Sequence, residues 1–474
     1  MKTRTEFTEI ESEASATATK DGLEFPRVST IPVGFVPTPT IDYRSHRKKM
    51  RAAVGSAAPR PVPIPLPRPL PGARVLMWKQ DPSVQEIGIR KALLPGHIFA
   101  GPKDARIGIQ GINTVTPNAF GDLIEQPGTD AFDAVHTFAV VRTTLTLYQR
   151  ATGTPMLWQW NTAGNTDPLN VFPHAGPTMN AFYSRSDKAL KFFFFNKPGD
   201  PPGPPWHIFT CRSLDIVSHE AGHAVLDALK PNWLLGGQPP QTGGLHESFG
   251  DLSAIFLTLS QMDQVEAIIA QTKANLHNKT FLSDLAEEFG LALGRTNGLR
   301  NADNDLKLSE VGTEVHAISQ VFTGAIYDIL ADIFAFERSP AKKDDAAVLY
   351  GAAEYLRGLL LRTIIAAPAQ AATFADVANQ MLTTVVADGK PAEYGTFIRN
   401  RFVVREVLQA NLAELGVEHK PGATLTAAVT DHPKATQNRA GCCGTMTHPE
   451  YYGLEEELQS ELKALKKASE KRVA

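Results

Sequence analysis

Residues 213–229 read SLDIVSHEAGHAVLDAL and contain the motif HEAGH at positions 219–223. Apolar residues recur around the motif at helical spacing, which predicts an amphipathic helix. Residues four apart share one face of a helix, so the imidazoles of His219 and His223 can reach a single metal ion. Glu220 projects from the adjacent part of that helix, where its carboxylate can take a proton from bound water. The alternative is a helix with two surface histidines, and a third ligand is needed to decide.

That third ligand is predicted at Glu247, in the second apolar-periodic stretch LHESFGDLSAIF (245–256). A catalytic zinc has three protein ligands and one open position for water, and His-His-Glu is such a set. Asp251 lies four residues after Glu247 on the same helix face, where it can accept a hydrogen bond from the other ring nitrogen of His219. The turn-forming segment 231–244 allows the two helices to converge. We therefore predict a zinc site with the ligands His219, His223 and Glu247.

The composition is that of an ordinary globular protein, with 474 residues, 43% hydrophobic residues and a formal net charge of -3. This length fits two or three domains, or one two-lobed enzyme with tails. The near-neutral charge gives no field that attracts nucleic acid or anionic membranes, which favours a small-molecule or protein partner. Three cysteines are too few, and odd in number, for a disulfide framework.

The N-terminal residues 1–22, MKTRTEFTEIESEASATATKDG, contain no apolar stretch of signal-peptide length. No run of about 18 apolar residues follows in the chain, so no membrane association is expected. We expect a soluble protein that is cytoplasmic or exported by a route other than Sec.

Four segments are predicted from the change of composition along the chain. Residues 1–72 form an extended or disordered tail, because 56–72 (SAAPRPVPIPLPRPLPG) carries proline at nearly every second position. This tail is interpreted as a linker or strap, with a docking ligand for a partner protein or an inhibitory arm as alternatives. Residues 73–212 form a β-rich N-terminal lobe, and 213–415 form a helical catalytic lobe. Residues 416–474 form a C-terminal extension with a short amphipathic helix.

Within the predicted N-terminal lobe, a long helix begins at Asp130. Residues 180–195 (NAFYSRSDKALKFFFF) are predicted to form two strands joined by a polar turn. The four successive phenylalanines at 192–195 predict a strand that is buried on both faces.

The combination of HExxH with a later ExxxD resembles the thermolysin family of gluzincin zinc peptidases. Further segments match in the family's order: Asn180 and Ala181 resemble the edge strand that grips an extended peptide, and Arg300 resembles an arginine that binds a carbonyl. His316, in EVHAISQVFTGAIYDIL, resembles the histidine that stabilises the tetrahedral intermediate. The resemblance covers residues 130–408. It implies an α+β, two-lobed zincin fold, with a β-rich N-terminal lobe, a mainly helical C-terminal lobe and the active-site helix between them.

The chain departs from the family at the oxyanion site. The family's tyrosine donor has no counterpart in LLGGQPPQTGG (234–244), and loss of one such donor typically costs about a hundred- to a thousand-fold in rate. Tyr183 and Tyr327 are the candidate substitutes. The acidic partner of His316 is expected at Glu310, nearest to the family's position, or at Glu314.

A second departure concerns calcium. Asp215 matches one calcium ligand of the family. A second acidic ligand of the family, one turn past Asp251, is replaced by Thr258. Because a hard cation needs about six to eight oxygens, we expect no calcium like that of secreted relatives.

The remaining histidines and cysteines are predicted to lie outside the ligand set. His246 precedes Glu247 and points about 100° away from it on a helix, which favours a surface or supporting position. Either cysteine of the pair Cys442 and Cys443 could cap the zinc, but no sequence feature requires it. Three other histidines are expected to be structural: His136, His174 and His207.

The predicted function is hydrolysis of peptide bonds by a zinc metalloendopeptidase that acts on a peptide or protein substrate. Zinc activates the water, Glu220 is the general base, and His316 with Arg300 stabilises the oxyanion. An aminopeptidase is one alternative, although no glutamate-rich segment for a free amine is seen. The other alternative is a catalytically weak or inactive zinc-binding scaffold that binds peptides or a protein partner.

Overall fold

The computed structural model describes residues 72–410, apart from 85–86, 202, 340 and 342–343. All described residues belong to the unit that spans Arg68–Ala474. The predicted proline-rich tail, apart from Gly72, lies outside the described residues. So do the predicted C-terminal extension with its short helix and the pair Cys442 and Cys443. The four-segment division of the chain therefore stays a prediction.

The first half of the described chain contains small sheets. One hairpin pairs β1 with β2 in antiparallel register, from Gly72 opposite Pro95 to Trp78 opposite Ile89. A second sheet has the order β3-β4-β6-β5, in which β3 pairs with β4 and β4 with β6 in parallel, and β5 pairs with β6 antiparallel. The strands are β1 (Gly72–Trp78), β2 (Ile89–Pro95), β3 (Ile107–Ile109), β4 (Leu169–Phe172), β5 (Ala181–Ser184), β6 (Ala189–Phe192), β7 (Phe194–Phe195) and β8 (Ile208–Phe209).

Strand β5 is important for the site because it is an edge strand that packs against helix α3 (Leu214–Leu229). It forms the predicted hairpin with β6, from Ala181 opposite Phe192 to Ser184 opposite Ala189. Among the described residues no strand pairs with its other edge.

The prediction of one buried strand over 192–195 is wrong. Strand β6 ends at Phe192, strand β7 begins at Phe194, and Phe193 between them is only half-buried. The reason is a change of partner: the N–H of Phe193 donates to Thr210 Oγ1, and its carbonyl accepts from the N–H of Thr210. The chain then continues into β7, which pairs with β8 instead of β5.

Helix α2 (Asp130–Thr152) begins at the predicted residue. The side chain of Thr129 accepts a hydrogen bond from the N–H of Phe132, and Gly153 ends the helix in the left-handed conformation with φ of 70°. The helix packs against β1, β3 and α3 and so connects the sheets with the helices that follow.

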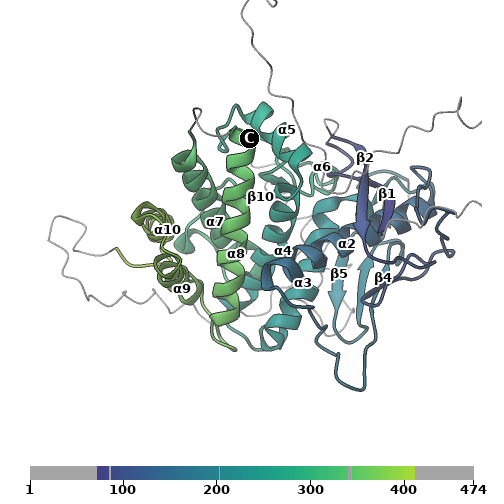
Figure 1. Ribbon diagram of the computed structural model, residues 1–474, viewed down its shortest axis with the longest axis horizontal. Helices are drawn as coiled ribbons and strands as arrows, with labels where there is room; N and C mark the ends of the chain where they lie inside the picture. The colour runs from purple at the N-terminus through teal and green to yellow at the C-terminus, as the bar shows by residue number, and fades with distance from the viewer. Residues whose placement is uncertain (1–71, 85–86, 202, 340, 342–343, 411–474) are drawn as a thin grey trace, which may run out of the picture. The chain divides into compact units, whose positions relative to one another are not determined.

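The second half of the described chain is mainly helical, as Figure 1 shows. Its helices are α3 (Leu214–Leu229), α4 (Pro240–Leu259), α5 (Met262–Thr272), α6 (Glu287–Ala292), α7 (Val315–Glu337), α8 (Asp345–Ala366), α9 (Phe374–Ala387) and α10 (Ala392–Val404). A short strand pair, β9 (Asp284–Leu285) with β10 (Arg300–Asn301), lies among them, and short 3-10 helices occur at Thr210–Arg212, Pro231–Leu234 and Leu308–Glu310. The chain is thus a mixed α/β structure with small sheets and a mostly helical C-terminal part, compatible with the α+β class.

Helix α4 is central to the packing, because every one of its residues is buried and it packs along both α3 and α7 (Figure 1). A large apolar cluster extends from Val75 in β1 to Leu408 after α10. Among the described helices, α7 has the length and composition of a membrane span, with mean hydropathy of 1.3. However, 83% of that stretch is buried inside the protein. Such burial is typical of a core helix.

Two glycines allow α3 and α4 to approach closely. A Cβ atom on Gly222 would lie 2.5 Å from Ser253 Oγ and 3.2 Å from the Cα of Gly250. A Cβ atom on Gly250 would lie 2.6 Å from the imidazole of His219. Glycine at both positions therefore brings the second helix against the first at the level of the HEAGH motif.

Candidate metal centre

The histidines of the motif lie one turn apart on α3. The helix starts with a cap in which the side chain of Ser213 accepts a hydrogen bond from the N–H of Ile216. The rings of His219 and His223 are buried, with centroids 4.6 Å apart and planes at 89°. Helical spacing thus brings both imidazoles to the side of α3 that faces α4, as the sequence predicts.

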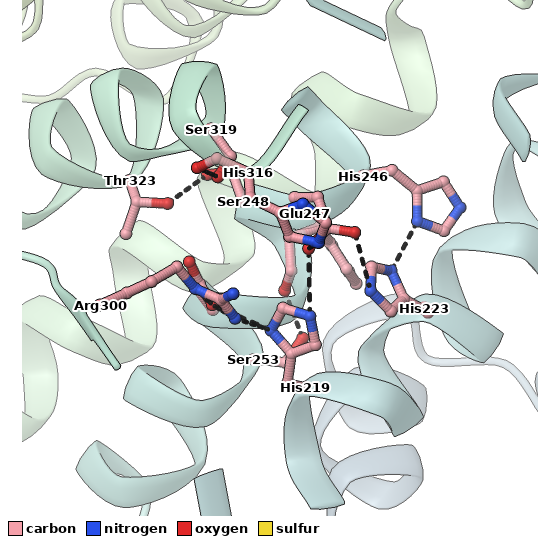
Figure 2. A network of polar contacts seen from close by, with 12 residues as sticks. His219, His223, His246, Glu247, Ser248, Ser253, Arg300, His316, Ser319 and Thr323 are labelled. Carbon is pink, nitrogen blue, oxygen red and sulfur yellow. Dashed lines mark hydrogen bonds and ion pairs between the residues drawn. The ribbon is translucent and has the colours of Figure 1, made fainter. Parts of the chain in front are cut away.

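Helix α4 brings the carboxylate of Glu247 to both rings. Its Oε2 lies 3.4 Å from His219 Nε2, and its Oε1 lies 3.5 Å from His223 Nε2. One donor atom from each of the three residues lies within 4.8 Å of the others. Figure 2 shows the three side chains turned toward one another. The structure therefore brings the predicted ligand set together.

The donor atoms of this cluster fit a metal ion. Three buried atoms of the cluster have no hydrogen-bond partner among the described residues: both carboxylate oxygens of Glu247 and Nε2 of His219. A buried carboxylate without a hydrogen bond is strongly unfavourable unless a cation compensates it. Two imidazole nitrogens and one carboxylate are also a donor set that divalent transition metals bind.

Two other groups of potential ligands occur in the described part of the chain: Asp133 with His174 and Cys211, and His277 with Asp303 and Asp328. In each group, an arginine already forms an ion pair with one of the carboxylates. Arg212 lies 2.8 Å from Asp133, and Arg405 lies 2.8 Å from Asp328. A guanidinium at the carboxylate opposes a second cation, so neither group matches the cluster on α3 and α4.

His219 has a charged support. Its Nδ1 lies 2.9 Å from Asp251 Oδ1, which also accepts hydrogen bonds from Arg300 Nε at 3.0 Å and Nη2 at 2.7 Å. Burial would raise the pKa of Asp251, but the charge of Arg300 and the hydrogen bond from His219 outweigh it and lower the pKa. Asp251 therefore lies where the sequence predicts it. Arg300, in β10, contacts this carboxylate directly.

His223 has a neutral support that the sequence left undecided. His223 Nδ1 lies 2.7 Å from His246 Nδ1, and both rings are fully buried. Burial is the main cause that lowers the pKa of His246 to about 3, so this ring is neutral. The surface alternative for His246 is wrong because α4 is buried on all sides. The apolar residues of 245–256 were the sequence signal that could have indicated a buried position for His246.

His316 lies near the N-terminus of α7 and faces the same carboxylate. Its Nε2 is 3.3 Å from Glu247 Oε2, and its Nδ1 is 2.5 Å from Glu314 Oε1. Glu314 also caps α7 by accepting from the N–H of His316 and Ala317. Glu314 is therefore the acidic partner, whereas Glu310 caps its own turn by accepting from the N–H of Lys307.

The charge state of His316 follows from this environment. Burial lowers the pKa of the ring, but the charges of Glu247 and Glu314 and the hydrogen bond from Nδ1 reverse the effect and raise it to about 9. The ring is thus an imidazolium at neutral pH in the metal-free protein, with Nε2–H directed at the cluster.

A pocket opens beside the cluster and is lined by both His219 and Glu220 of the motif. Glu220 is 1% exposed, and Asp251, Arg300 and Ala181 of β5 also line the pocket. Its apolar wall comes from α3, α4 and the segment from β9 to β10: Ile216, Ala254, Leu285, Ala286, Phe289 and Leu299. An acid–base group and an apolar wall therefore meet next to the edge strand.

The amide of Asn180 lies at the start of β5 and is buried. Its Oδ1 accepts a hydrogen bond from the N–H of Ala181, and its carbonyl accepts one from Thr210 Oγ1. These contacts hold the beginning of the strand in place. Ala181, the next residue, is the one that reaches the pocket.

Neither tyrosine suggested as an oxyanion donor serves that role in the structure. The hydroxyl of Tyr183 donates to Asp227 at 2.7 Å, and that of Tyr327 donates to the carbonyl of Leu276 at 2.7 Å. Both side chains are 1% exposed. Each hydroxyl therefore belongs to another buried contact.

The residues that the sequence compared with a calcium site have protein partners. Asp215 Oδ2 accepts from the N–H of Ala286, and Thr258 Oγ1 accepts from Gln80 Nε2. Burial, followed by the charge of Asp81, raises the pKa of Asp215 well above its usual value. Burial therefore disfavours the charged form of this carboxyl.

Neither a protein-family model nor a curated protein matches the sequence. A solved structure similar to the chain is the precursor of protealysin, a metalloproteinase from Serratia proteamaculans. It matches 59% of this chain and 80% of its own, with 15% identity and a TM-score of 0.39.

Proposed function

We propose that the protein is a zinc-dependent peptidase, of the endopeptidase type, built on a two-lobed gluzincin scaffold. The observation that carries this proposal is the convergence of His219, His223 and Glu247, whose donors are buried and lie within 4.8 Å of one another. The apolar pocket with Glu220 beside the cluster supports a hydrolytic role.

Zinc bound by these three residues would polarise the substrate carbonyl and lower the pKa of a bound water from about 15.7 toward about 7. Glu220 takes a proton from the attacking water as general base and passes it to the leaving amine as general acid. Its place beside His219 in the pocket supports this role. The nitrogen–carbon bond breaks as the amine receives the proton.

His316 is proposed to stabilise the negative charge on the carbonyl oxygen. Glu314 accepts the Nδ1 proton, so Nε2–H of the imidazolium is the donor that faces the site. A charged donor fixed before the reaction stabilises the transition state without reorganisation. Arg300 is proposed to receive a substrate carbonyl, since it lines the pocket that also contains Glu220.

The proposed substrate is a peptide or protein that binds as an extended strand. The peptide would lie beside β5, since Ala181 of this strand lines the pocket. The apolar wall favours an apolar side chain next to the scissile bond. Neither a nucleic acid nor a membrane partner is proposed.

The test is the variant Glu220→Gln, measured for zinc content and for cleavage of a broad peptide library by mass spectrometry. We expect one bound zinc and a rate lowered about 100- to 10,000-fold, because the amide cannot accept the proton. The matched control is Glu310→Gln, which changes an exposed acid that caps a turn and should keep the rate. A fully active Glu220→Gln protein would contradict the assignment.

The second candidate function is a weakly active or inactive zinc-binding scaffold. The engaged hydroxyls of Tyr183 and Tyr327 favour it, since neither replaces the missing oxyanion donor. A wild-type protein with one equivalent of zinc that cleaves nothing in the library would support it. If cleavage occurs, comparison of N-terminally blocked and free peptides separates an endopeptidase from an aminopeptidase.

A further inference from the structure

A second buried imidazole lies behind one of the proposed zinc ligands. His246 precedes Glu247 on α4, and its Nδ1 lies 2.7 Å from His223 Nδ1. The two ring centroids are 4.8 Å apart with planes tilted by 33°. In Figure 2, His223 lies between the carboxylate of Glu247 and the ring of His246. His246 is completely buried. Burial of a polar ring is costly, so its contact with His223 needs an explanation.

Two imidazole nitrogens at this distance share one proton, and its position decides what His223 can bind. When the proton is on Nδ1 of His223, that ring donates to His246. Nε2 of His223 is then unprotonated, and its lone pair is directed at the cluster. When His246 donates instead, Nε2 of neutral His223 carries the proton and cannot bind a metal. Only the first arrangement is compatible with the proposed function.

We propose that His246 is the positioning residue for His223: it orients the ring and accepts the Nδ1 proton, so that Nε2 points at the metal. This inference rests on the proposed zinc site. Its role for His223 parallels that of Asp251 for His219, whose Nδ1 lies 2.9 Å from the carboxylate. A carboxylate can only accept, whereas an imidazole can accept or donate, so the two supports differ in chemistry.

The test is the zinc affinity of the purified full chain, measured by competition with a chelator. His246→Leu keeps a similar volume but has no acceptor, and we expect zinc binding to weaken by about 10- to 100-fold. His246→Asn places an amide oxygen close to the position of the ring Nδ1, so it should recover most of the affinity. The matched control is His136→Leu, a buried histidine of α2 that stacks on Phe132, which should bind zinc as the wild type does.

A second measurement separates positioning from general stability. Nitrogen-15 NMR of the imidazoles in the zinc-loaded protein should show His223 protonated at Nδ1 and bound through Nε2. Wild-type affinity in His246→Leu, or equal losses in the Leu and Asn variants, would overturn the positioning role while the zinc proposal stands. A wild-type chain that binds no zinc would overturn both.

Discussion

The two proposed ligands on α3 lie one turn apart and are both buried, yet their supports differ. His219 is held by the charged pair of Asp251 and Arg300, whereas His223 is held by the neutral ring of His246. The charged support contains a buried ion pair, and removal of one member takes away the opposite charge that compensates the other. The neutral support carries no such penalty. We therefore expect the two sides to respond differently to substitution, in stability as well as in metal affinity.

The largest effect on metal binding is expected at Glu247, which both histidines face. Changing a supporting residue typically costs about 10- to 100-fold in affinity, so Glu247→Ala should cost more than about 100-fold. Chelator competition measures the loss. Glu310→Ala, at an exposed acid, is the control and should leave the affinity unchanged. Tight zinc binding by Glu247→Ala would show that Glu247 is not the third zinc ligand beside His219 and His223.

The next prediction compares the two supports directly. Asp251→Ala removes the carboxylate that faces the mostly buried guanidinium of Arg300, so the free energy of unfolding should fall by about 3–5 kcal/mol. His246→Leu removes a neutral hydrogen-bond partner of His223 and should cost about 1–3 kcal/mol. Urea denaturation of both metal-free proteins measures the difference. Equal losses would mean that the charge on the His219 side does not distinguish the two supports.

Much of this centre could be predicted from the sequence, because helical spacing places His219 with His223 on one face of α3, and Glu247 with Asp251 on one face of α4. Helix α2 was predictable in the same way from its apolar period and its cap. These patterns are local, so they survive folding unchanged.

Features that depend on tertiary contacts were harder to predict from the sequence. The break of the strand at Phe193 depends on Thr210, which lies 17 residues later. The choice of Glu314 as the partner of His316 depends on how α7 begins, because the same carboxylate caps that helix. The role of His246 depends on which side of α4 meets α3, and no spacing rule fixes that rotation.

A smaller effect is expected from the glycines that set the contact between α3 and α4. Gly222→Ala and Gly250→Ala should each destabilise the fold by about 1–3 kcal/mol through overpacking. Their metal affinities should differ, because the new methyl at Gly250 meets the ring of His219, whereas that at Gly222 meets Ser253. Thermal unfolding and chelator competition on both variants measure this. Unchanged zinc affinity in Gly250→Ala would mean that the ring of His219 shifts but keeps its orientation toward the metal.

The smallest effect is expected where a similar histidine–aspartate pair is exposed. His277 Nδ1 lies 2.8 Å from Asp303, but the histidine side chain is 43% exposed, unlike the buried pair of His219 with Asp251. The hydrogen bond that His277 donates to the carboxylate of Asp303 is the main cause that raises the pKa of His277 above its usual value of about 6.5. The stabilisation is therefore complete below about pH 6.5 and is lost as the pH rises through the raised pKa of the folded state. Because the pair is solvent-screened, His277→Gln should cost less than about 1 kcal/mol at about pH 5.5 and almost nothing at about pH 9, as measured by urea denaturation. A loss that grew with pH would show that the protonated ring does not stabilise the fold through Asp303.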